Sequence, residues 1–130
     1  MASDPRNLTY DAGALIAAER DDRRVWALQK QALNRHLLPT VPAGVLAQAW
    51  RGGPQAQLSR LLAGCRVEEM TEPRARSAGS ACAIAGTSDV VDASVVVGAS
   101  ARGDIVITSD EGDLAQLRDA LQLDTRIQKI

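Results

Sequence analysis

Short apolar runs alternate with longer segments of helical periodicity along almost the whole chain. The apolar and β-branched runs predict strands at residues 8–10, 37–41, 66–70, 105–108 and 126–130. Helical spacing between them predicts helices at 14–18, 22–35, 42–50, 55–63, 73–85, 89–101 and from about 113 to 121. Strands that alternate with helices favour a mostly parallel sheet covered on both faces. We therefore predict an α/β fold with three layers, α/β/α.

Two helix starts and one buried helix can be placed from local residue types. Pro42 suits the first turn of a helix, because a missing N–H costs nothing there. Ser88 can cap the helix that follows it. This helix, 89–101, carries valines on nearly every side, which predicts a position in the middle of the domain.

Size and charge suit one domain without a general affinity for nucleic acid. The chain has 130 residues, and we expect an N-terminal tail at 1–7 followed by a single domain at 8–130. The formal net charge is -1, from 15 basic and 16 acidic residues. No overall basic field is present, so RNA binding would have to come from a local site.

Cysteine, histidine and apolar content narrow the class of protein further. Cys65 and Cys82 are far apart, and we expect both to be free thiols buried as small hydrophobes. His36 is the single histidine, which argues against a Cys/His zinc site, and we expect it at the surface or a helix end. No secretory segment and no membrane-length apolar stretch is visible. We therefore expect a soluble, cytoplasmic protein.

Three aspartates fall where α/β proteins bind ligands, beyond the carboxyl ends of parallel strands, and a fourth lies near them in sequence. Asp11 follows the first predicted strand, and Asp110 follows the strand at 105–108. Asp92 lies in the first turn of the valine-rich helix, where a carboxylate is costly unless it is paired or bound to metal. Asp113 lies one turn beyond Asp110.

Such a cluster suits a divalent cation. Mg²⁺ and Mn²⁺ prefer carboxylate oxygens and retained waters, and a cation offsets the repulsion between carboxylates. Two such ions about 4 Å apart can activate a water and stabilise the leaving oxygen in phosphodiester cleavage.

Each aspartate also has a structural alternative. Asp110 and Asp113 could cap a helix and favour its dipole, and Asp11 could begin a turn. Asp89, three residues before Asp92, is expected to be only a cap. From the residues alone, the metal site and the structural roles stay evenly balanced.

These segments resemble the motifs of the PIN-domain family in its VapC-type toxins. Residues 8–16 are similar to its opening strand, acidic residue and small-residue turn, and residues 45–51 to its second motif. Residues 89–93 and 106–114 are similar to the third and fourth motifs. The order and spacing match from Leu8 to Leu121, although no single motif is specific.

The resemblance implies a PIN-like domain with a metal-dependent endoribonuclease activity that hydrolyses RNA phosphodiester bonds. It also implies the toxin role in a type II toxin–antitoxin pair, a VapB-like antitoxin as partner, and a homodimer. Asp11, Asp92 and Asp110 take the positions of the Mg²⁺ or Mn²⁺ ligands, and Asp113 takes an additional acidic position. Thr108 and Ser109 lie beside Asp110 and could orient a carboxylate or a water.

The sequence departs from this family at two positions. Gln48 stands where the second motif usually carries glutamate, so a negative charge and a possible base are missing. The helical wheel puts Gln48 at the margin of the apolar stripe, with Gly44 one turn earlier leaving space beside it. Gln48 could therefore face the site, and a surface glutamine is the alternative. Gly13 stands where the family often has Ser or Thr. We therefore expect weaker or more selective metal binding than with a full set of acidic ligands.

Phosphate contacts require Lys or Arg near the acidic residues. Arg51, three residues after Gln48, is the first candidate. The other candidates are Arg20, Arg23, Arg24, Arg74, Arg76 and Arg102. For each one alone, a solvated charged surface is the more common role.

Two other functions compete with the ribonuclease. The first is a catalytically impaired PIN-fold protein that binds RNA or protein, for which Gln48 and Gly13 are the evidence. The second is a phospho-accepting receiver domain, which would need an acidic pair after the first strand and a lysine after the fifth. Asp11 stands alone, and no lysine occurs between Lys30 and Lys129, so the sequence argues against this rival.

Overall fold

The computed structural model describes residues 6–130. In chain order the elements are β1 (Leu8–Tyr10), α1 (Ala12–Glu19), α2 (Arg23–Asn34), β2 (Thr40–Pro42), α3 (Ala43–Ala49), α4 (Ala56–Ala63), β3 (Arg66–Glu68), α5 (Glu72–Ala85), α6 (Val90–Arg102), β4 (Ile105–Thr108), α7 (Gly112–Ala120) and β5 (Ile127–Lys129). Every predicted strand and helix is present, with boundaries that differ by a few residues.

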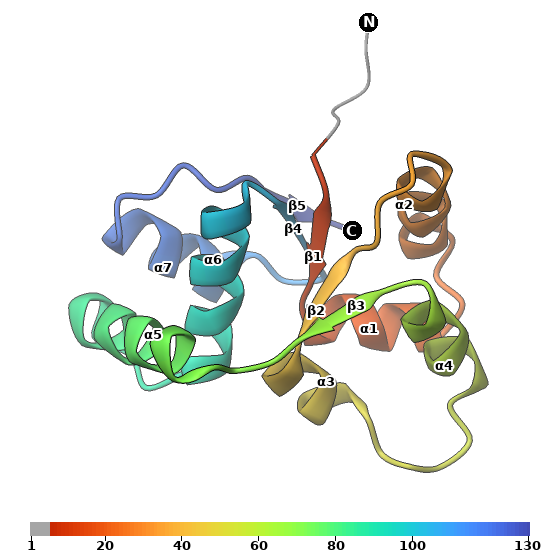
Figure 1. Cartoon of the computed structure of the whole chain (residues 1–130), viewed down its shortest axis with the longest axis horizontal. Helices are drawn as coiled ribbons and strands as arrows, with labels where there is room; N and C mark the ends of the chain where they lie inside the picture. Colours follow the sequence, from red (N-terminus) through yellow and green to blue (C-terminus); the bar gives the residue numbers. More distant parts are fainter. Residues whose placement is uncertain (1–5) are drawn as a thin grey trace, which may run out of the picture.

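The strands form one parallel sheet with the order β3-β2-β1-β4-β5. Strand β1 lies in the centre, where Thr9 pairs with Thr40 on one side and Val106 on the other. All strand pairs are parallel, which confirms the predicted mostly parallel sheet. Their carboxyl ends therefore meet at one edge of the sheet (Figure 1).

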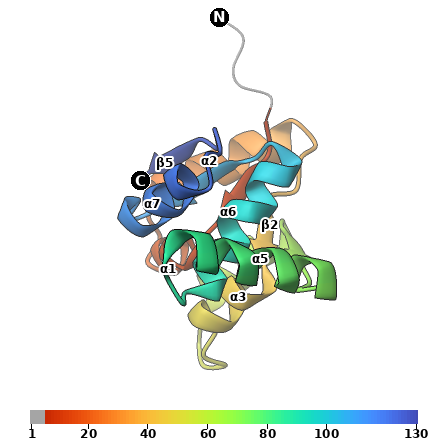
Figure 2. The same cartoon turned by 90° about the vertical axis from the view of Figure 1, so that its left-hand side faces the viewer.

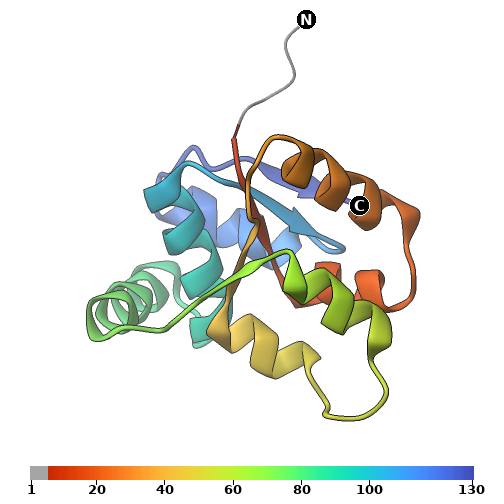
Figure 3. The ribbon, with the colours of Figure 1, turned by 45° about the vertical axis from the view of Figure 1, so that its right-hand side comes forward.

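Helices cover both faces of the sheet, which confirms the three-layer fold. Helices α5, α6 and α7 lie on one side, and α1, α2 and α4 lie on the other (Figures 1 and 3). Helix α6 lies between α5 and the sheet (Figure 2). Because α6 runs against the strand direction before β4, its first turn reaches the carboxyl edge of the sheet.

Small aliphatic side chains build most of the core. Val95 and Val96 of α6 are fully buried, as the valine pattern predicts, whereas Val90 at the helix start is half exposed. Tyr10 is also fully buried, and its hydroxyl donates to Oε1 of Gln29 at 2.8 Å. Burial raises the pKa of Tyr10 far above its usual value, so the hydroxyl stays protonated as a donor.

Two predicted helix starts were wrong by one residue. Pro42 is the last residue of β2, where it pairs with Glu68 of β3, so its backbone is extended, with ψ 140°. It therefore caps α3 and does not belong to the first turn of that helix. Asp89, and not Ser88, caps α6, and its Oδ1 accepts the backbone N–H of Asp92 at 3.0 Å. The expectation that Asp89 is a cap is therefore confirmed.

A buried ion-pair network ties the edge strand β3 to the centre of the sheet. The guanidinium of Arg102 donates to Oε2 of Glu68 at 2.5 Å and to Oδ2 of Asp104 at 2.9 Å. It also donates to the hydroxyl of Thr9 at 3.0 Å, which itself donates to Asp104. Asp104 is only 4% exposed, so its charge depends on these partners.

The expectations on the cysteines and the histidine are met, except for the burial of Cys65. Cys65 and Cys82 are free, but only Cys82 is buried, whereas Cys65 is partly exposed. His36 is exposed just after α2. Residues 1–5 of the predicted tail lie outside the described part of the chain, while the side chain of Asn7 donates to the carbonyl of Leu38 at 2.7 Å.

Within residues 6–130, no single helix is long and apolar enough to cross a membrane. Helices α5 and α6 reach that length and composition only as a pair, bent by 109°.

Candidate active site

The structure brings the four predicted aspartates to the carboxyl edge of the sheet. Asp11 follows β1, and Asp110 follows the neighbouring strand β4. Asp92 lies in the first turn of α6, and Asp113 lies in the first turn of α7. Two strand ends and two helix starts thus place acidic side chains in one region.

Asp11 is held by hydrogen bonds to both carboxylate oxygens. Its Oδ1 accepts the backbone N–H of Ala14 at 2.9 Å and so caps α1. Its Oδ2 accepts the hydroxyl of the buried Thr108 at 2.5 Å. Burial raises the pKa of Asp11, the Thr108 and backbone hydrogen bonds oppose that rise, and the charge of Asp110 adds to it.

Asp92 has the most strongly raised pKa of the four aspartates. Burial, followed by the neighbouring charge of Asp89, raises its pKa to about 6. Asp11 and Asp113 add smaller repulsive effects in the same direction. The carboxylates are therefore close enough to repel one another without a cation between them.

Two of the four aspartates share a pocket of about 270 Å³ with the cap residue Asp89. Asp89 and Asp92 line it from the start of α6, and Asp113 lines it from α7. Thr87 and Gln116 add polar side chains. The pocket could admit water and a hydrated cation beside the carboxylates.

Asp110 supports the start of α7, but it is not the cap that the alternative prediction made it, because Glu111 holds the cap position. Oδ1 of Asp110 accepts the backbone N–H of Gly112 at 3.1 Å, at the start of α7. Its own backbone N–H donates to the hydroxyl of Thr108 at 3.1 Å. Thr108 therefore links Asp110 to Asp11, as its position beside Asp110 suggests.

The donor chemistry of the cluster fits a hard divalent cation, since all of its acidic groups are carboxylates. Within residues 6–130, no three acidic, His or Cys side chains are near enough to one another to share one ion. Metal binding would therefore require the side chains of Asp92, Asp110 or Asp113 to move closer together. Asp11 is already fixed by its two donors.

Gln48 is exposed on α3. The expected space beside it, at Gly44, does not exist, which corrects the sequence-based expectation. A Cβ at Gly44 would lie 3.2 Å from Cγ2 of Val91, because α3 packs closely on α6 there. The glycine is thus explained by helix packing and not by a site around Gln48.

Gly13 has a different explanation. A Cβ built at this position would lie 2.1 Å from Oγ of Ser109. The hydroxyl of Ser109 therefore occupies the space that a Ser or Thr side chain at position 13 would need. Nothing in either local sequence indicates this contact, because the two residues lie on different elements.

Most of the arginines considered for phosphate binding already have other partners. The guanidinium of Arg51 donates to the carbonyls of Ala47 and Trp50, which closes the end of α3. Arg24 pairs with Asp22, Arg76 with Glu72, and Arg102 with Glu68 and Asp104. Arg74 lies 3.8 Å from Glu68.

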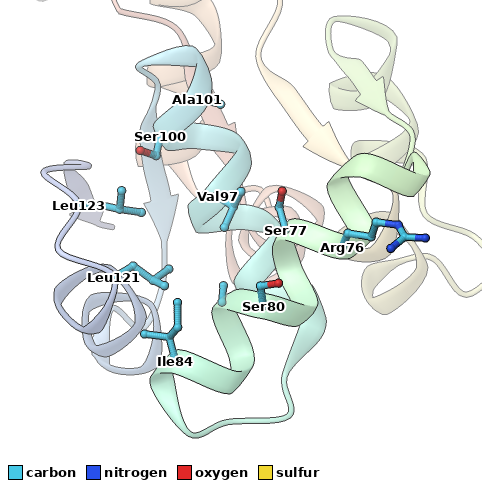
Figure 4. A pocket seen from close by; sticks show the side chains of 10 residues that line it. Arg76, Ser77, Ser80, Ile84, Val97, Ser100, Ala101, Leu121 and Leu123 are labelled. Carbon is cyan, nitrogen blue, oxygen red and sulfur yellow. The ribbon is translucent and has the colours of Figure 1, made fainter.

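A larger pocket, of about 560 Å³, lies away from the aspartates between α5, α6 and the segment after α7 (Figure 4). Apolar side chains such as Ile84, Val97 and Leu121 point into it, together with Ser77 and Ser80 (Figure 4). No carboxylate lines it, so it offers none of the chemistry of the acidic edge.

No protein-family model and no curated protein matches the sequence. Solved structures do match the fold. VapBC2 from Rickettsia felis, solved bound to a DNA fragment from its promoter, matches with a TM-score of 0.68 at 10% identity, over 95% of this chain and 98% of that chain. PAE2754 from Pyrobaculum aerophilum matches with a TM-score of 0.61 at 16% identity, over 88% and 86% of the two chains. At these identities the comparison establishes the fold, and the chain has the three-layer, PIN-like fold of these proteins.

Proposed function

We propose that the protein is a metal-dependent endoribonuclease that hydrolyses RNA phosphodiester bonds. The observation that carries this proposal is the meeting of Asp11, Asp92, Asp110 and Asp113 at the carboxyl edge of the sheet. The raised pKa of Asp92 supports it, because burial and repulsion among carboxylates favour either a proton or a cation at this place.

In this proposal the four aspartates hold Mg²⁺ or Mn²⁺. When bound, such an ion would supply an activated water and charge stabilisation for the leaving oxygen of the phosphodiester. Thr108 keeps Asp11 in place through its hydroxyl, and Asp113 completes the acidic lining from α7. Gln48 lowers the negative charge relative to a site with a fifth acidic residue, so we expect moderate metal affinity.

The biological role we propose is that of the toxin in a type II toxin–antitoxin pair. Support comes from the likeness in fold to VapBC2, whose structure contains DNA from its promoter. A VapB-like antitoxin would be the partner, RNA the substrate, a homodimer the assembly and the cytoplasm the location.

A second candidate is a PIN-fold protein that binds RNA or protein without cutting it. The neutral, exposed Gln48 and the absence of three converging ligands within residues 6–130 favour this candidate.

A cleavage assay separates the two candidates. Purified protein is incubated with end-labelled single-stranded RNA, with Mn²⁺ or with EDTA, alongside the variant Asp92→Asn. The exposed Asp119 provides a control, because Asp119→Asn removes the same charge from α7 outside the acidic pocket. A ribonuclease cleaves only with Mn²⁺ and loses activity in Asp92→Asn alone. Mn²⁺-independent activity, or activity equal in both variants, would refute the proposed site.

A further inference from the structure

A pocket of about 360 Å³ opens beside the aspartates and carries basic side chains. Gly13 and Ser109 line it, and they are close in sequence to Asp11 and Asp110. Arg20, the residue that ends α1, lines it as well. The pocket is therefore next to the proposed cleavage site but has a different chemistry.

Arg20 is the cation that this pocket can offer to a ligand. Arg24 and Asp22 also line the pocket, but they pair with each other at 2.6 Å, so their charges offset one another. Arg20 is exposed and forms no ion pair with another residue in the described range 6–130. The guanidinium of Arg20 is therefore available to bind an anion.

Because Gly13 has no side chain, the side chain of Ser109 can line the pocket. A Cβ at position 13 would lie 2.1 Å from Oγ and 3.1 Å from Cβ of Ser109. Any larger residue would therefore displace the serine from the pocket. The Ser109 hydroxyl makes no hydrogen bond to another side chain or backbone group within residues 6–130, so it can serve a ligand.

We propose that this pocket binds a phosphate of single-stranded RNA, next to the phosphate that is cleaved. A guanidinium and a hydroxyl are both donors to phosphate oxygens. Ile16, which is 42% exposed in the same lining, offers an apolar surface to the ribose or base. The carboxylates repel the RNA backbone, so a cationic contact beside them is needed to hold it. This inference rests on the proposed function and names how its substrate is held.

The test measures RNA binding without cleavage. Fluorescence anisotropy of a labelled single-stranded RNA is recorded in EDTA over a range of salt concentrations. Wild type is compared with Arg20→Ala, Ser109→Ala and Gly13→Ala. Lys30→Ala is the charge-matched control, because Lys30 is an exposed cation on α2 that does not line the pocket.

We expect Arg20→Ala to weaken binding by about tenfold and to lower the slope of log Kd against log salt by about 0.7, as for one lost phosphate contact. Gly13→Ala and Ser109→Ala should weaken binding as well, while Lys30→Ala should leave both quantities near wild type. Circular dichroism checks that Gly13→Ala folds, and Arg20→Ala tests the pocket independently of it.

Equal effects of Arg20→Ala and Lys30→Ala would overturn the inference, as would a wild type that binds no RNA. Arg20-dependent binding by a protein that cuts no RNA in Mn²⁺ would support the pocket while refuting the ribonuclease. The two proposals can therefore fail separately.

Discussion

The hydroxyl of Thr108 lies 2.5 Å from Oδ2 of Asp11, and this contact joins the ends of the neighbouring strands β4 and β1. Oδ1 of the same carboxylate is held by the N–H of Ala14 at 2.9 Å. Asp11 is thus fixed from two sides by the protein itself. The other acidic residues of the cluster are fixed less completely, so Asp11 is the anchor of the candidate site.

Replacing Thr108 by valine keeps the shape of the side chain and removes the donor to Asp11. We expect the free energy of unfolding to fall by about 1–3 kcal/mol, because a buried carboxylate oxygen loses its partner. The pKa of Asp11 should rise further, since this hydrogen bond lowers it. Urea denaturation at pH 7 measures the loss, and Thr108→Ser, which keeps the hydroxyl, should recover most of it. A loss as large in Thr108→Ser would assign the effect to packing instead.

The acidic cluster should make the metal-free protein less stable as the pH rises. The folded-state pKa of Asp92 is about 6 and the ordinary value is 3.8, so between these values the folded state binds more protons than the unfolded state. This group's contribution to stability is therefore fully present below about pH 4 and is lost as the pH rises through 6.

Asp92→Asn cannot ionise and should remove this pH dependence. Because Asp92 is only half-buried, we expect the variant to exceed wild type in stability by no more than about 1 kcal/mol at pH 7 in EDTA, with little difference at pH 4. Urea denaturation at several pH values measures both proteins. A wild type whose stability rises steadily from pH 4 to 7 relative to Asp92→Asn would contradict the shift.

Introducing the missing acidic residue tests whether α3 faces the site. Gln48→Glu should raise Mn²⁺ affinity in calorimetric titration and raise the rate of RNA cleavage. The fold should be unaffected, because Gln48 is exposed. Gln31→Glu, which adds the same charge to an exposed position of α2, is the control. If Gln48→Glu changes affinity and cleavage no more than Gln31→Glu does, Gln48 lies outside the site.

The buried network around Arg102 should dominate the stability of the sheet edge. Arg102→Ala leaves Asp104 and Glu68 without their close cation, so we expect a loss of about 3–5 kcal/mol in the free energy of unfolding. Arg76→Ala breaks an exposed pair with Glu72 and should cost about 1 kcal/mol or less. Guanidinium denaturation measures both, and equal losses would show that the network is not the support we describe.

The order of strands and helices could be predicted because it depends on local patterns. The apolar run at β4, the valines of α6 and the cap at Asp89 are each visible within a few residues. The rule that ligands bind at the carboxyl ends of parallel strands then led to Asp11 and Asp110. Asp92 followed from the cost of a carboxylate among valines.

Contacts between distant segments could not be predicted in the same way. Gly13 and Ser109 are 96 positions apart in the chain, and only the pairing of β1 with β4 brings them together. Gly44 appeared to open space for Gln48, but α3 packs on Val91 instead. The sequence favours a solvated surface for Arg102, whereas in the fold its guanidinium pairs with Glu68 and Asp104.

Manganese binding measured by electron paramagnetic resonance tests the central claim most directly. Mn²⁺ is titrated at pH 7 into wild type, Asp92→Asn and the control Asp119→Asn, and the signal of free Mn²⁺ is followed. The aspartate cluster predicts saturable binding to wild type and Asp119→Asn, and binding weakened at least about tenfold in Asp92→Asn. Equal Mn²⁺ binding by all three proteins, or none by wild type, would contradict a metal site at this edge of the sheet.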